Sequence, residues 1–228
     1  KQKELYHAHA QRLALMLQNQ TEEEFADSRF QVLSELTRLR QLCCDPALVY
    51  ENYEGGSAKL DLCIELIQSA VESGHKILLF SQFTSMIEIL TARLQEESIS
   101  YFVLQGSTKK EQRAQMVEQF NRDDTSVFCI SLKAGGTGLN LTGADIVIHY
   151  DPWWNVAVEN QATDRAHRIG QKNVVTVYKL IAKGTIEEKI IKLQQMKKEL
   201  AEEILSGDEI KTASFQREEL LELLEERF

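Results

Sequence analysis

The segment VFCISLKAGGTGLNLTGADIVIHYDPWWNVAVENQATDRAHRIGQ, residues 127–171, is the most informative part of the chain for its architecture. It begins with an apolar run at residues 127–130, and a second run follows at residues 146–150. Both runs are apolar throughout rather than alternating, which is typical of strands buried on both faces of a parallel sheet. A helix is expected next, over residues 156–169, so the segment predicts two strands followed by a helix.

The same alternation of short apolar runs and amphipathic helices extends in both directions. Further strands are expected at residues 77–80, 101–104 and 174–181, with helices over residues 85–97, 109–121 and 186–205. This order predicts an α/β fold, in which a mostly parallel sheet is covered on both faces as a doubly wound, three-layer α/β/α domain. Ligands of such sheets bind beyond the carboxyl ends of the strands.

The two ends of the chain are expected to be helical. Helices are predicted over residues 6–17, 30–42 and 59–71, and the second of these carries Phe30, Leu33, Leu36, Leu39 and Leu42 at helical spacing before Asp45-Pro46 ends it. An acidic helix near the C-terminus carries Leu220, Leu221, Leu223 and Leu224. We therefore expect an N-terminal helical segment over residues 1–57, the α/β domain over residues 58–185, and a long helix with an acidic helical tail over residues 186–228.

Composition and charge limit the possible partners. The 228 residues are 43% hydrophobic and 27% charged, which is typical of a globular protein. The net charge of −9 is unusual for a protein that binds nucleic acid. The acidity lies at the ends, however. Residues 161–198 hold nine Lys and Arg against three Asp and Glu, so this segment is the one expected to face phosphates, with an ordinary solvated surface as the alternative.

No apolar run is long enough to span a bilayer, and residues 1–10 lack the apolar stretch of a signal peptide, so an intracellular protein with no membrane partner is expected. The four cysteines have no CxxC spacing, which predicts reduced structural thiols rather than a zinc or redox site.

Two motifs carry chemistry. Residues 133–141, KAGGTGLNL, place three glycines within four residues after a strand, and glycine lets backbone amides approach a phosphate closely. The segment is neither a Walker A loop nor a GxGxxG fingerprint, so a structural turn is the alternative. Arg165 and Arg168 lie three apart, and on a helix both guanidinium groups could face one phosphate; surface salt bridges are the alternative.

These motifs together resemble the Swi/Snf branch of the superfamily-two helicase-like motors. Residues 127–171 resemble motif V, the following tryptophan-bearing segment and motif VI; residues 76–90 (KILLFSQFTSMIEIL) resemble motif IV, and residues 101–121 (YFVLQGSTKKEQRAQMVEQFN) motif IVa. Residues 39–49, 57–67 and 178–200 resemble flanking blocks, the last including a brace helix. The resemblance covers roughly residues 30–200 and implies a RecA-like C-terminal helicase lobe.

The resemblance implies a role for particular residues. Arg165 and Arg168 match the arginine fingers that reach the γ-phosphate of ATP, and the other ATP-binding positions are Gln161, Gly136, Thr137 and Gly138. Positions near the DNA backbone are Ser81, Gln82, Gly106, Ser107 and Lys133. Trp153 and Trp154 match the segment beside the DNA, and for one of them we expect a buried anchor instead.

The family also needs a Walker A lysine and a DExx carboxylate, and neither motif is present here. Asp151 is interpreted as a strand end. The resemblance therefore implies a fragment that is inactive alone, with ATP and Mg²⁺ held by an N-terminal helicase lobe of the full-length chain and with double-stranded DNA as the partner. A non-catalytic RecA-like scaffold with an acidic tail, and a small-molecule nucleotide enzyme, are the alternatives. A prokaryotic source is mildly favoured.

Overall fold

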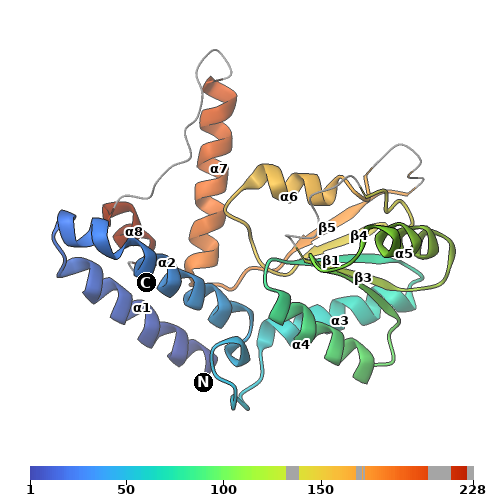
Figure 1. Ribbon diagram of the computed structural model, residues 1–228, viewed down its shortest axis with the longest axis horizontal. Coiled ribbons are helices and arrows are strands. Elements are labelled where there is room, and N and C mark those ends of the chain that lie inside the picture. The colour runs from blue at the N-terminus through green and yellow to red at the C-terminus, as the bar shows by residue number, and fades with distance from the viewer. Residues whose placement is uncertain (132–138, 168–170, 172, 205–216, 225–228) are drawn as a thin grey trace. The chain divides into compact units, whose positions relative to one another are not determined.

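The computed structural model describes residues 1–131, 139–167, 171, 173–204 and 217–224. The chain forms two compact units, one of residues 58–181 and one that combines residues 1–57 with residues 182–228 (Figure 1). The segments before and after the α/β domain therefore belong to one unit. None of the helices in the described part of the chain is long and apolar enough to cross a membrane.

A five-stranded sheet forms the centre of the first unit. Its strands are β1 (Ile77–Ser81), β2 (Tyr101–Leu104), β3 (Val127–Ser131), β4 (Ile146–His149) and β5 (Thr176–Lys179). They are all parallel, in the order β2-β3-β1-β4-β5. This arrangement confirms the predicted parallel sheet. β5, at one edge, is shorter than the apolar run at residues 174–181 suggested, and all four of its residues are exposed.

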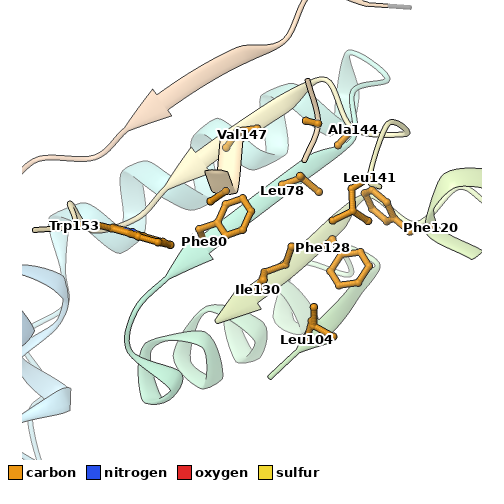
Figure 2. Packing of buried hydrophobic residues seen from close by; sticks show 12 residues of the cluster. Leu78, Phe80, Leu104, Phe120, Phe128, Ile130, Leu141, Ala144, Val147 and Trp153 are labelled. Atoms are coloured by element: carbon orange, nitrogen blue, oxygen red, sulfur yellow. The ribbon is translucent and has the colours of Figure 1, made fainter. Parts of the chain in front are cut away.

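Four helices belong to the same unit, α3 (Ala58–Glu72), α4 (Thr84–Glu96), α5 (Lys110–Arg122) and α6 (Val156–Thr163). In Figure 1, α3 and α4 lie on one side of the sheet and α6 lies on the other. Successive side chains of a strand point to opposite faces. Leu78, Phe80 and Phe128 accordingly pack in one buried cluster with Phe120 of α5 and Ala162 of α6, as Figure 2 shows for most of its members.

The opposite face of the sheet is just as closely covered. Ile77 and Leu79 of β1, which alternate with the residues of the first cluster, are fully buried, and α4 contacts both β1 and β3. Because both faces are covered, the central strands β1, β3 and β4 carry apolar residues at every position but the last. The predicted three-layer fold is confirmed, and all four cysteines are buried thiols.

The second unit is helical, with α1 (Gln2–Gln18), α2 (Glu22–Cys44), the 3₁₀ turn η1 (Pro46–Leu48), α7 (Ile186–Ile204) and α8 (Arg217–Leu224). Thr21 and Glu24 form a capping box that starts α2, and Asp45 ends it in extended geometry, as expected before a proline. The hydroxyl of Tyr6 accepts a hydrogen bond of 2.7 Å from the backbone N–H of Ile186. Helices from the two ends of the chain thus pack together.

The helical spacing from Phe30 to Leu42 does not mark one buried face. Phe30 is 88% exposed and Leu33 is 57% exposed, whereas Leu36 and Leu39 are buried. A strict three-residue repeat rotates about 60° per step around a helix of 3.6 residues per turn, so its members leave any single face within a few turns.

Candidate functional site

The carboxyl ends of β1 and β4 are joined through one buried carboxylate. Asp151, two residues beyond β4, is 1% exposed and accepts a hydrogen bond of 2.6 Å from the hydroxyl of Ser81, the last residue of β1. The side-chain amide of Gln82 donates to the same carboxylate and, at 3.3 Å, to the carbonyl of Pro152. Asp151 thus orients both the end of β1 and the residue that follows it.

These contacts place two of the residues that were assigned to the DNA backbone. Ser81 is fully buried, and Gln82 is half-buried beside it. Asp151 indeed follows a strand end, but it also organises its neighbours, which the sequence did not indicate. Its role as an acceptor depends on the register between β1 and β4, in which Phe80 pairs with His149.

Gly106 and Ser107 are exposed in the loop that follows β2. Arg113 of α5 holds this loop from one side, because its guanidinium donates to the carbonyls of Gly106, at 3.1 Å, and Thr108, at 2.8 Å. The hydroxyl of Thr108 accepts from the backbone N–H of Gln105 at 3.1 Å. The loop therefore presents exposed polar groups on a fixed backbone, which suits contact with a phosphate chain.

The two tryptophans differ in burial. Trp153 is 5% exposed and belongs to the buried cluster, so it is the buried anchor that was expected for one of the pair (Figure 2). Its ring lies edge-on to the imidazole of His149, with 6.0 Å between the ring centroids. Trp154 is half-buried.

Arg165 does not lie on a helix, contrary to the prediction of a helix through residue 169. α6 ends at Thr163, and the backbone N–H of Arg165 donates to the carbonyl of Ala162 in a tighter turn. The carbonyl of Arg165 accepts a hydrogen bond of 3.0 Å from the backbone N–H of Leu141. This tertiary bond uses an acceptor that would bond within a continuing helix, so Arg165 is not on the helix from which a shared face with Arg168 was predicted.

The side chain of Arg165 is held inside the protein. It is 5% exposed, and its guanidinium carbon lies 5.6 Å from the centre of the Phe80 ring. Gln161, by contrast, is exposed on α6. Lys133, Gly136, Thr137, Gly138 and Arg168 lie outside the described residues.

Gln171 fastens the segment after the glycines to the segment after α6. Its side-chain amide donates to the carbonyls of Ala144, at 2.7 Å, Ala166, at 3.1 Å, and Thr142, at 3.2 Å. With the bond between Leu141 and Arg165, it joins the regions that resemble motifs V and VI. The sequence showed these regions to be close together in the chain but gave no sign of these bonds.

Comparison with known proteins identifies the family. The Helicase conserved C-terminal domain family matches residues 58–170. A Mycoplasma pneumoniae protein described as an uncharacterized ATP-dependent helicase is 45% identical over 87% of this chain, which spans only 19% of that protein.

Two solved structures extend the likeness to the fold. The C-terminal domain of a Sulfolobus solfataricus SWI2/SNF2 ATPase has a TM-score of 0.78 at 31% identity, covering 100% of this chain and 94% of that domain. The ATPase core from the same organism in complex with double-stranded DNA has a TM-score of 0.75 at 35% identity, covering 90% of this chain and 43% of that core. The RecA-like fold expected from the sequence is thereby confirmed, and the chain belongs to the SWI2/SNF2 family of ATPases as a helicase C-terminal domain.

Proposed function

We propose that this chain is the C-terminal motor lobe of an ATP-dependent translocase or remodeller that acts on double-stranded DNA. In this proposal Arg165 and Arg168 contact the γ-phosphate of an ATP molecule held by the N-terminal lobe of the full-length protein. Exposed groups beyond the strand ends, among them Gly106 and Ser107, contact the DNA backbone. The relative that was solved with double-stranded DNA supports the choice of nucleic acid.

The observation that carries the proposal is the connection between Arg165, in the segment that follows α6, and the carboxyl ends of β1 and β4. Arg165 lies against Phe80 of β1, and the two residues after Phe80 are tied to Asp151 beyond β4. A movement of the arginine toward or away from a phosphate would therefore be transmitted to the loops at the same edge of the sheet. Such a connection is what a motor needs if nucleotide chemistry is to move its grip on a DNA strand.

In the proposed cycle, ATP between the lobes draws the arginines onto the γ-phosphate, and hydrolysis releases them. Guanidinium groups stabilise the charge that builds up on the phosphoryl oxygens during transfer. Because backbone contacts carry no base information, movement along DNA would be independent of sequence and sensitive to salt.

In this proposal the chain contacts the phosphates of ATP and does not hold the metal ion. The carboxylate of Asp151 already accepts hydrogen bonds from the side chains of Ser81 and Gln82, the two residues that follow Phe80. The described part of the chain also has no group of three or more His, Cys, Asp or Glu residues that could hold a metal. The proposal places Mg²⁺ in the N-terminal lobe of the full-length protein.

The first test compares ATP hydrolysis by this 228-residue chain with that by a chain extended to include the N-terminal lobe, each with and without double-stranded DNA. The proposal expects no turnover from the short chain and DNA-stimulated turnover from the extended one. Robust turnover by the short chain would contradict it, because the phosphate-binding residues would then lie elsewhere. An extended chain that binds DNA but never hydrolyses ATP would favour the scaffold.

The second test replaces the arginines in the extended chain. Arg165→Ala and Arg168→Ala should each lower the turnover number by about 10³-fold, the usual worth of an arginine finger, while DNA affinity changes far less. Arg122→Ala is the matched control, because it removes the same charge from an exposed residue that forms an ion pair with Glu118, one helical turn away. Equal losses of turnover and DNA affinity would remove the finger assignment.

A further inference from the structure

His149 and Phe80 form a stacked pair at the carboxyl ends of β4 and β1. The two residues are register partners on neighbouring parallel strands, so both side chains point to the face covered by α5 and α6. Their ring centroids are 5.4 Å apart, with 19° between the ring planes. Because the guanidinium of Arg165 also lies against the Phe80 ring, an imidazole, a phenyl ring and a guanidinium form one continuous set of contacts.

A hydrogen bond links the same imidazole to the end of α6. Nε2 of His149 lies 2.9 Å from the hydroxyl oxygen of Thr163, the last residue of the helix. That hydroxyl donates to the carbonyl of Glu159 at 3.3 Å, so its oxygen can accept the Nε2–H of a neutral imidazole. Thr163 stands two residues before Arg165, so His149 is linked to Arg165 both through the Thr163 hydroxyl and through the Phe80 ring.

Burial, and not the net effect of the surrounding charges, favours the neutral form of the His149 ring. Burial lowers the pKa of His149 to about 4; the nearby carboxylate of Glu159 opposes the change, and the ammonium of Lys179 adds to it. Glu159 and Lys179 form an ion pair with each other. A neutral imidazole adds no positive charge beside the guanidinium of Arg165.

We propose that His149 is a positioning residue, which holds Arg165 in place for phosphate contact through the Phe80 ring and the Thr163 hydroxyl. The inference rests on the proposed function, since it assigns to His149 the orientation of one proposed arginine finger. An arginine has many rotamers, and a finger is effective only if packing and hydrogen bonds hold it close to its working geometry. The buried guanidinium of Arg165 meets that condition.

The test uses the extended protein with both helicase lobes and substitutes Thr163, which is the milder of the two changes available. Thr163→Val keeps the shape of the side chain and removes the hydroxyl, whereas Thr163→Ser keeps the hydroxyl. We expect Thr163→Val to lower kcat about 10-fold, a fraction of what misplacing a reacting group by about 1 Å can cost, with DNA affinity and KM for ATP changed less than about 2-fold. Thr163→Ser should recover most of the activity.

Arg165→Ala separates this inference from the function beneath it. If Arg165→Ala leaves kcat unchanged, the finger assignment and the inference both fail. If Arg165→Ala lowers kcat but Thr163→Val does not, only the positioning role of His149 is overturned.

In the double variant, Thr163→Val should add nothing to the loss caused by Arg165→Ala, because there is no longer a guanidinium to position. A full additional 10-fold loss would mean that Thr163 acts on another group. Melting temperatures measured alongside verify that each variant is folded at the assay temperature.

Discussion

His149 is expected to make the unit that contains the sheet sensitive to acid. Its pKa is about 4 in the folded protein because the ring is buried, against an ordinary value of 6.5 in an unfolded chain. Above pH 6.5 the ring is neutral in both states, and its contribution to stability is complete. As the pH falls from 6.5 toward 4, His149 is protonated in the unfolded chain but stays neutral in the folded chain, so the folded state loses stability relative to the unfolded one. Below pH 4 the loss is complete.

The size of this loss follows from the gap between the two values. At about 1.4 kcal/mol per pH unit, the gap is worth about 3–4 kcal/mol in full, most of which should already be lost at pH 4.5. This is a large fraction of the stability of an ordinary domain, which is about 5–15 kcal/mol.

Urea unfolding at pH 7.5 and pH 4.5 measures the effect in the wild type and in His149→Phe. Phenylalanine keeps a ring beside Phe80 but cannot titrate. Both tryptophans of the chain lie in the unit that contains the sheet, so their fluorescence follows the unfolding of this unit. Between the two pH values the wild type should lose about 2–3 kcal/mol more than the variant, since the other titrating groups are common to both proteins. Equal losses would show that His149 is not held neutral and would refute the reasoning.

Two further predictions concern the unit that contains the sheet and the helical unit. Phe128→Ala should lower the free energy of unfolding by about 3–5 kcal/mol, because it leaves a cavity at a fully buried position. Phe30→Ala should change the free energy of unfolding by less than about 0.5 kcal/mol, because Phe30 is exposed. Similar losses for the two variants, measured by calorimetry or urea unfolding, would contradict this difference in burial. Asp151→Asn should cost about 2 kcal/mol in the same fluorescence assay, because it weakens the charge-assisted hydrogen bonds from Ser81 and Gln82, and a neutral outcome would mean that the carboxylate is not their organiser.

The sheet could be predicted because its signal is local. A strand buried on both faces must be apolar at each position, and the runs at residues 77–80 and 127–130 meet that condition directly. The exposed β5 at the sheet edge lacks this constraint, which is why its limits were predicted less well. The end of α2 was also local, since a proline fixes the geometry of the residue before it.

The arrangement around Arg165 could not be predicted because it depends on contacts between distant segments. The sequence favoured a helix through residue 169, but α6 ends at Thr163, and the carbonyl of Arg165 accepts a hydrogen bond from the distant backbone N–H of Leu141. The stacking of His149 on Phe80 requires the register of β1 against β4, and no pattern within either strand specifies that register. For the same reason, the hydrogen bonds of Asp151 with Ser81 and Gln82 could not be predicted from the sequence.

The bond between Leu141 and Arg165 joins two main-chain atoms, and this affects how its importance could ever be detected. Every residue except proline supplies the same N–H at position 141, and every residue supplies the same carbonyl at position 165. Side chains at both positions could therefore change during evolution without disturbing the link, and neither an alanine scan nor residue covariation would register it. Only a change to the backbone itself, such as an amide-to-ester substitution introduced by chemical synthesis at residue 141, would break this bond while leaving the side chains intact.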